Sequence, residues 1–404
     1  MASVMWPGQN RLRPFGVARS LPSVDSPPSS PAVPPSRLWS LDVMRGGCAM
    51  AVFLCHWHLW SDFAPQAGFE HGVRLVGEKA YDLFTTLTWP TGGHHPAVIG
   101  FFVLSGFCIH YPFAQRARAG LPQPGWKDYF SRRFLRIMPV FWTACVFGLI
   151  FVLAETHRPS GDLLLSTHAA GSPGEIAVRF AALAGLYPHE IFAGNYPLIT
   201  VAVELLMYAL YPLVYAQAAR GRWLGLGLGF VFLQLVAVWL LQYVTPYWVF
   251  NSVLMFGLFW YAGALAAHLY VNRHTVVRGH WLLAAWLAYL ALKAAPHFYG
   301  ITLFKQAAWA LVCTFGLLWA LRREALHPAA QSRPVVVALR YSGRISYSLY
   351  AMHTPAIMLA TWGLLSFTGI RDYLVQLAVT FTATAALTLL TYHGVERVFY
   401  RPRV

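Results

Sequence analysis

Long apolar runs alternate along this chain with short connections that carry most of its charged residues. Ten of the runs approach about 20 residues, the length at which an α-helix crosses the hydrocarbon core of a bilayer. The ten runs cover residues 42–60, 97–113, 137–154, 197–217, 223–244, 248–270, 281–296, 302–321, 345–367 and 373–393. Barrel strands would instead show stretches of alternating polarity of about ten residues, which the sequence lacks. The pattern predicts an all-α, polytopic membrane protein with about ten transmembrane helices.

The composition supports a membrane location. Hydrophobic residues make up 57% of the 404 positions and charged residues only 11%, whereas soluble domains carry about 25% charged residues. The 16 Trp, 20 Tyr and 27 Phe fit helices whose aromatic side chains lie at membrane interfaces. The five cysteines lie in apolar segments and show no spacing typical of a disulfide framework or a metal site. An ordinary soluble enzyme is excluded.

The first 36 residues differ from the rest of the chain. They hold eight of the 26 prolines and seven serines, a composition that cannot bury a hydrophobic core. We therefore expect a disordered, Pro/Ser-rich cytoplasmic tail over residues 1–36 and a transmembrane domain over residues 37–404.

The charge of +15 is distributed unevenly between the two sides of this predicted bundle. Of the 30 lysines and arginines, 22 lie in the N-terminal tail, the C-terminus and alternate connections, and only six lie in the other connections. Positively charged loops stay in the cytoplasm, so both termini are expected to be cytoplasmic and the number of spans even. The basic charge thus reports membrane topology, and no nucleic-acid partner is expected.

Arg45 and His56 lie in the first apolar run, where an ionisable side chain is costly and usually functional. Eleven helical steps separate them, which returns the helix to within about 20° of the same face and moves about 16.5 Å along its axis. The small residues Ala49 and Val52 lie between them and are expected to leave a groove, and Asp42 is placed to hold the guanidinium. This geometry suits a long ligand with an anionic end. The alternative is that Arg45 snorkels to the interface and His56 only packs.

Further polar residues lie in the third and fourth runs. Arg133 and Arg136 are one helical turn apart, an arrangement suited to phosphate groups, although simple anchoring at the cytoplasmic face is an equal alternative. Glu204 stands among aliphatic residues, with Tyr208 one turn further on. A carboxyl group at that depth must be protonated or paired with a cation.

Four other polar residues have simpler interpretations. Ser105 precedes Gly106 in an apolar run without a Gly-x-Ser-x-Gly motif, which favours close helix packing over a nucleophile. His94 and His95 precede Pro96 in a predicted outer loop, where capping is favoured over metal ligation. His58 lies about 200° around the helix from His56, so the two cannot chelate one metal. No metal site is expected.

Together these segments resemble the acyltransferase family 3 membrane proteins from about residue 37 to the C-terminus. The most specific element is the spacing of Arg45 and His56 in a run that opens Leu41-Asp42-x-x-Arg45-Gly46. Residues 101–106, the Arg133-x-x-Arg136 pair, residues 195–212 with Glu204, and residues 346–355 ending after His353 are similar to later family motifs. Ile199 stands where the family usually has tryptophan. The resemblance implies the stand-alone form without an SGNH hydrolase-like domain.

The resemblance implies a multi-pass enzyme of the bacterial inner membrane that moves an acyl group, acetyl being favoured, from acyl-coenzyme A to a hydroxyl of a carbohydrate or glycosylated acceptor. Arg45, Arg133 and Arg136 suit the phosphates of coenzyme A, because guanidinium groups bind phosphate bidentately. His56 suits a general base on the acceptor hydroxyl or a transient acyl carrier. No metal is implied.

On the same interpretation, Glu204 orients His56 or balances the charge of Arg45, and Tyr208 and His353 line the acceptor side. Two alternatives stay open. The chain could be a membrane-bound O-acyltransferase of another family, or a proton-coupled transporter that uses Glu204 and His56 as a relay. Release of a thiol from acyl-coenzyme A distinguishes the enzymes from the transporter.

Overall fold

The computed structural model describes residues 38–59, 67–156, 172–186, 194–243, 249, 251–296 and 299–399. The predicted tail over residues 1–36 lies outside them. The described residues form helices and no strands, which confirms the predicted fold class. The helices are α1 Trp39–Leu59, α2 Phe69–Thr88, α3 Pro96–Arg118, α4 Trp126–Thr156, α5 Pro173–Phe180, η2 Ala184–Leu186, α6 Leu198–Ala219, α7 Trp223–Tyr243, α9 Val253–Arg273, α10 Gly279–Lys293, α11 Tyr299–Leu326, η3 Pro328–Ser332, α12 Pro334–Thr368, α13 Tyr373–Thr391, the π-helical turn η4 Tyr392–Glu396 and α14 Arg397–Phe399.

Each of the ten predicted runs contains a helix, and seven helices of the described residues are long and apolar enough to cross a membrane. These seven are α3, α4, α6, α7, α9, α11 and α13 with the turn that follows it. The other three are α1, α10 and α12. Helix α10 has only 15 residues, which is short of the length of a bilayer span, and α1 carries Asp42, Arg45 and His56 among its apolar residues. The chain is a polytopic membrane protein, and the count of ten stays a prediction.

Helix α4 begins eleven residues before the predicted run 137–154, so that Arg133 and Arg136 belong to its first turns. The predicted boundary was too late because it followed hydrophobicity, whereas charged residues with good helix propensity extend the helix into the interface.

Two predicted connections also contain helices. Residues 61–96, between the first two predicted runs, include the 20-residue helix α2, which has no buried residue. Residues 176–193 lie in the connection between the predicted runs 137–154 and 197–217. The structure shows the short α5 and one turn of 3₁₀ helix there, and residues 187–193 lie outside the described part.

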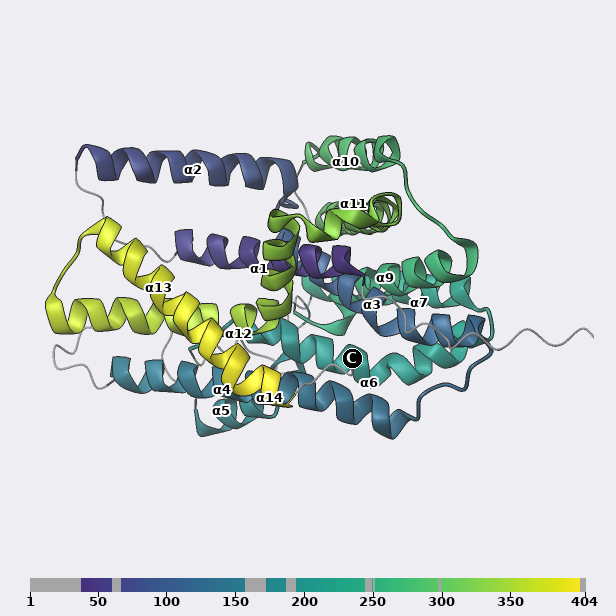
Figure 1. Cartoon of the computed structure of the whole chain (residues 1–404), viewed down its shortest axis with the longest axis horizontal. Helices are drawn as coiled ribbons and strands as arrows, with labels where there is room; N and C mark the ends of the chain where they lie inside the picture. The colour runs from purple at the N-terminus through teal and green to yellow at the C-terminus, as the bar shows by residue number, and fades with distance from the viewer. Residues whose placement is uncertain are drawn as a thin grey trace, which may run out of the picture. The chain divides into compact units, whose positions relative to one another are not determined.

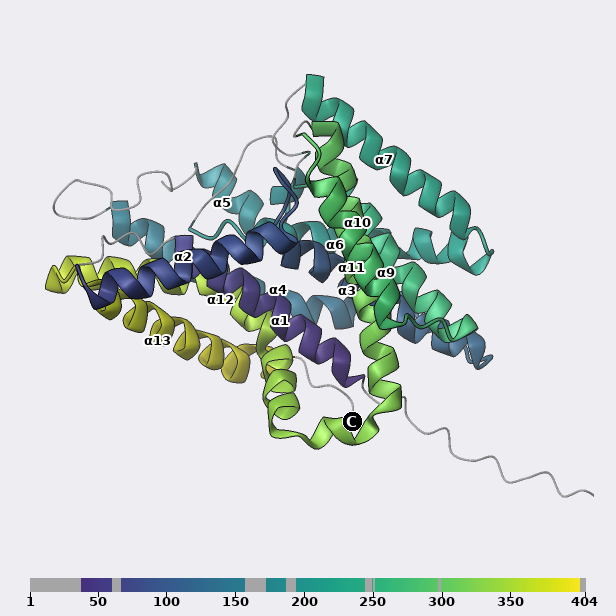
Figure 2. The same cartoon turned by 90° about the horizontal axis from the view of Figure 1, so that it is seen from above.

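Two helix pairs approach closely through glycine. Helix α1 packs along α12, and a side chain at Gly343 would overlap the backbone oxygen of Asp42. Helix α3 packs along α9, where Gly106 and Gly263 each meet the backbone of the other helix. Helices α12 and α13 lie toward one end of both views, and α7 and α9 toward the other (Figures 1 and 2). The close α1–α12 pair brings the candidate residues of the first and late runs together.

Candidate active site

One pocket collects residues from five helices. It lies among α1, α3, α4, α6 and α12, and five of the residues singled out in the sequence line it. These five are Arg45, Arg133, Arg136, Glu204 and Tyr208. Sequence reasoning assigned them to separate segments, and the fold places them around a single cavity.

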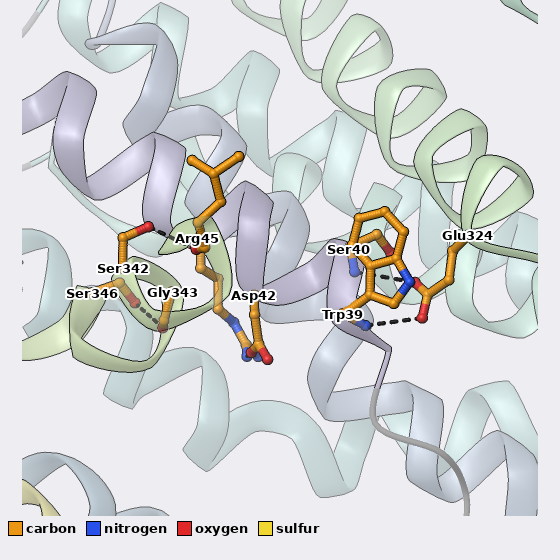
Figure 3. A network of polar contacts seen from close by, with 9 residues as sticks. Trp39, Ser40, Asp42, Arg45, Glu324, Ser342, Gly343 and Ser346 are labelled. Atoms are coloured by element: carbon orange, nitrogen blue, oxygen red, sulfur yellow. Dashed lines mark hydrogen bonds and ion pairs between the residues drawn. The ribbon is translucent and has the colours of Figure 1, made fainter. Parts of the chain in front are cut away.

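Arg45 reaches this pocket from the first half of α1. Its Nη1 lies 3.7 Å from Oδ1 of Asp42, which is almost fully buried, so the expected ion pair is present. Figure 3 shows the two side chains meeting next to Ser342 and Gly343 of α12. Because Gly343 has no side chain, the backbone of α12 can approach Asp42 closely, and the ion pair lies against that helix.

The start of α1 is fixed by Glu324 from α11. The Glu324 carboxylate accepts hydrogen bonds from the backbone N–H of Trp39 at 2.9 Å and of Ser40 at 3.1 Å, and from the Ser40 hydroxyl at 2.6 Å (Figure 3). A carboxylate at this position satisfies N–H groups that have no partner inside the helix and complements the helix dipole. This contact could not be predicted from local sequence pattern, because 284 positions separate Ser40 from Glu324.

Glu204 accepts two hydrogen bonds on the same oxygen. The hydroxyl of Ser105 donates to Oε1 at 2.8 Å, and the hydroxyl of Tyr208 also donates to Oε1. Ser105 was interpreted as a packing residue. That interpretation was incomplete, because the serine lines the pocket and contacts Glu204 while Gly106 beside it makes the close helix contact.

Arg133 lies over two aromatic rings, with its guanidinium carbon 5.6 Å from the Tyr208 ring centre and 5.9 Å from the Tyr129 ring centre. Arg136 lines the same pocket one turn further along α4. Arg132, in contrast, is exposed and donates to the backbone oxygen of Asp128 at 3.1 Å. The shared face of Arg133 and Arg136 therefore points into the pocket.

His56 and His353 form a second part of the site. His56 Nδ1 lies 2.6 Å from His353 Nε2, and the two rings are nearly parallel, with an interplanar angle of 3°. His353 has no exposed surface. Its Nδ1 lies 2.7 Å from the backbone oxygen of Tyr350 and 3.2 Å from that of Leu349.

These contacts define the protonation of the two neutral rings. A carbonyl oxygen only accepts hydrogen bonds, so His353 Nδ1 must carry its proton, and His353 Nε2 is then an acceptor. His56 Nδ1 must therefore donate to it. The remaining nitrogen of His56, Nε2, is left unprotonated and able to take up a proton.

This arrangement differs from two expectations. Glu204 was expected to orient His56 or to balance Arg45, but its hydrogen bonds go to Ser105 and Tyr208, and His353 orients His56. A groove was also expected along α1 past Ala49 and Val52. Both are buried in helix packing, and α3 and α12 supply much of the pocket wall instead.

Tyr350 links the pocket to the histidine pair. It lines the pocket, its ring centre lies 5.9 Å from that of His353, and its hydroxyl is 2.6 Å from that of Thr200. Thr200 and Tyr350, like Ser346, line the pocket but were not named as candidates from the sequence. Tyr350 follows the i, i+3 spacing to His353, which is the signal that places it on the same helix face.

In the described part of the chain, no group of three or more His, Cys, Asp or Glu side chains is arranged to hold a metal ion. The candidate site is therefore composed of a pocket with three arginines and a hydrogen-bonded carboxyl group, next to a histidine pair with a defined tautomer.

Comparison with known protein families identifies the chain. A family model described as an acyltransferase domain, that of acyltransferase family 3, matches residues 38–393. No curated protein and no solved structure matches. The matched range covers most of the chain and includes every residue of the pocket and of the histidine pair. The protein therefore belongs to acyltransferase family 3 and is a membrane acyltransferase.

Proposed function

We propose that the protein transfers an acetyl group from acetyl-coenzyme A to a hydroxyl of a carbohydrate or glycosylated acceptor. The observation that carries this proposal is the pocket in which Arg45, Arg133 and Arg136 meet. Coenzyme A is a long molecule with phosphates at one end and a thioester at the other. Three guanidinium groups suit the phosphate end, because each can bind a phosphate bidentately.

The acyltransfer step follows from the tautomer of His56. Its unprotonated Nε2 takes the proton of the acceptor hydroxyl while the hydroxyl oxygen attacks the thioester carbonyl. The carbon–sulfur bond then breaks, and the leaving thiolate takes the proton from Nε2. In the alternative step His56 Nε2 itself attacks the thioester and carries the acyl group to the acceptor. His353 holds the His56 ring in the required orientation in both cases.

In this proposal Glu204 acts on residues of the pocket rather than on His56. Through one oxygen it holds the hydroxyls of Ser105 and Tyr208, and the Tyr208 ring in turn lies under the Arg133 guanidinium. We assign Glu204 and Tyr208 to the organisation of the donor pocket, where Tyr208 contacts the donor. In this assignment His353 acts through His56, whereas the sequence placed both Tyr208 and His353 on the acceptor side.

The proposal includes a location in the bacterial inner membrane with both termini in the cytoplasm. The excess of lysine and arginine on one side of the predicted bundle supports this orientation. Arg45 then lies near the cytoplasmic face, where coenzyme A is available, and His56 lies about 16.5 Å deeper. The acceptor reaches the histidine pair from the opposite side of the membrane.

Thiol release from labelled acetyl-coenzyme A tests the proposal. Purified protein is incubated with the donor and a panel of methyl glycosides and glycosylated small molecules, and both free thiol and labelled acceptor are measured. We expect stoichiometric release and labelling, and a loss of both in the Arg133→Ala/Arg136→Ala double variant. Arg222→Ala, which removes an exposed arginine outside the pocket, is the matched control. Proton-coupled uptake of solute without thiol release would overturn the proposal in favour of a transporter.

A further inference from the structure

His95 caps the first turn of α3. Its Nδ1 accepts a hydrogen bond from the backbone N–H of Ala97 at 3.2 Å, as the capping interpretation of the sequence expected. Because Nδ1 is an acceptor, a neutral His95 ring carries its proton on Nε2. Burial, and to a lesser extent the proximity of His353, lowers the pKa of His95 to about 4, so the ring stays neutral near pH 7. The cap thus fixes His95 Nε2 as a hydrogen-bond donor.

This donor is buried without a hydrogen-bond partner among the described residues. Nearly all buried polar atoms in proteins have a partner, so an orphaned donor calls for a physical explanation. Two aromatic side chains lie beside the ring, with the Trp89 ring centre 4.7 Å away and the Phe84 ring centre 5.9 Å away. These neighbours supply no acceptor for the Nε2 proton.

The position of His95 connects it to the active site. Val98, Phe102 and Ser105 line the pocket from α3, and their spacing of three to four residues continues back along the same helix face to position 95. His95 also interacts electrostatically with both His56 and His353. It therefore lies beyond the pocket-lining part of α3, at the end of the site that holds the histidine pair.

We infer that His95 Nε2 donates a hydrogen bond to an oxygen of the acceptor, next to the hydroxyl that His56 activates. An acceptor that fits both histidines presents two neighbouring oxygens, one that is acylated and one that is held. Carbohydrates offer such pairs as adjacent hydroxyls or as a hydroxyl beside the ring oxygen. This inference rests on the proposed function and narrows the acceptor to that class.

Two substitutions separate the capping role of His95 Nδ1 from the hydrogen-bond donor role of His95 Nε2. In His95→Asn the side-chain oxygen takes the place of Nδ1 and keeps the cap, since asparagine is a favoured N-cap residue, but nothing reaches the position of Nε2. In His95→Gln the longer amide places an N–H near the position of Nε2 and gives up the short capping contact. The thermal unfolding temperature in detergent measures the effect of losing the helix cap. Steady-state kinetics measure the effect of losing the hydrogen bond from Nε2.

The kinetics use acetyl-coenzyme A and the methyl glycoside that gives the fastest thiol release with the unaltered protein. We expect His95→Asn to raise the KM for the glycoside about tenfold, as for one lost hydrogen bond, with a much smaller change in kcat and in the KM for acetyl-coenzyme A. His95→Gln is expected to keep the glycoside KM closer to that of the unaltered protein. Glycosides that lack the neighbouring hydroxyl should show no further loss with His95→Asn.

The outcomes distinguish this inference from the function on which it rests. If the unaltered protein releases no thiol with any glycoside, the proposed function fails. If it does release thiol, and His95→Asn leaves the glycoside KM unchanged or both variants raise it equally, the role of His95 as an acceptor-binding donor is overturned while the function stands. His71→Asn, on the exposed surface of α2, controls for substitution of a histidine as such.

Discussion

His56 Nδ1 lies 2.6 Å from His353 Nε2, although 297 positions separate the two residues in the chain. The backbone oxygens of Leu349 and Tyr350 fix the proton of His353 on the far nitrogen, and this determines the tautomer of His56. A base whose orientation is set by a second side chain, itself set by the backbone, needs no rearrangement before it accepts a proton. This is the arrangement expected of a pre-organised general base.

Replacement of His56 by alanine should abolish acyl transfer without unfolding the protein. General-base catalysis contributes about 10²- to 10⁴-fold to a rate, and Arg45, which lines the pocket from the same helix, stays protonated and cannot replace the histidine as a base. Thiol release from acetyl-coenzyme A measures the effect. His71→Ala on the exposed face of α2 should retain the full rate, and equal losses in both variants would contradict the role of His56.

Replacement of His353 by alanine should lower kcat even though His56 is intact, because His56 then loses the acceptor that fixes its tautomer. We expect a loss of about 10- to 100-fold, in the range seen for partners that orient a reactive group. The double variant with His56→Ala should be no slower than His56→Ala alone, since the two residues act as a unit. Additive losses would show that His353 acts on its own.

Arg45→Lys should raise the KM for acetyl-coenzyme A although the positive charge is kept. Lysine cannot form the planar, bidentate contact of a guanidinium with a phosphate. Asp42→Asn should act in the same direction, because it releases Arg45. The control is Arg222→Lys at an exposed position outside the pocket. If Arg45→Lys left the KM for acetyl-coenzyme A unchanged, Arg45 would not bind the donor and would only anchor the helix at the membrane interface.

Gly343→Ala should destabilise the protein by about 1–3 kcal/mol, the usual cost of overpacking, because the added carbon would overlap the backbone oxygen of Asp42. Gly363→Ala in the same helix meets no atom within 4 Å and should be neutral or stabilising, since alanine favours the helix. Thermal unfolding in detergent compares the two. Similar unfolding temperatures would mean that α1 and α12 do not depend on this contact.

The two substrates should act from opposite sides of the membrane. In sealed inside-out vesicles, labelled acetyl-coenzyme A added outside is expected to label a glycoside trapped in the lumen, because Arg45 lies near the cytoplasmic face and His56 about 16.5 Å deeper. Vesicles without the protein provide the control. Labelling that requires donor and acceptor on the same side would replace this model with transfer at one face.

The sequence predicted what depends on local pattern. Apolar runs located the helices, and helical spacing predicted the shared face of Arg133 and Arg136 and the Asp42–Arg45 pair. It did not predict α2, because the charged residues of this amphipathic helix, which recur at positions 70, 74, 78 and 82, break the continuous apolar run by which a span is recognised. The true length of α4 was also missed, because its first turns lie outside the apolar run.

Contacts between distant helices could not be predicted in this way. Ser105, one of the two partners of Glu204, comes from α3, and the partner of His56 comes from α12. Spacing within one helix cannot specify which residue of another helix it meets. The contact between Ser105 and Glu204 was therefore not predicted, and Ser105 was given only a packing role. The role of Glu324 at the start of α1 depends on the same kind of long-range pairing.

In the proposed function, helix α1 sets the length of the acyl donor that the site accepts. It carries both Arg45 and His56, its first turn is held by Glu324, and its flank is held by α12, so the separation of about 16.5 Å between the two residues is set by a count of residues in a rigid element. A thioester that lacks the phosphate-bearing portion of coenzyme A can reach His56 or Arg45 but not both. One inserted residue between them would turn His56 by about 100° away from the face of Arg45. The length of the donor is thus encoded in the register of a single helix.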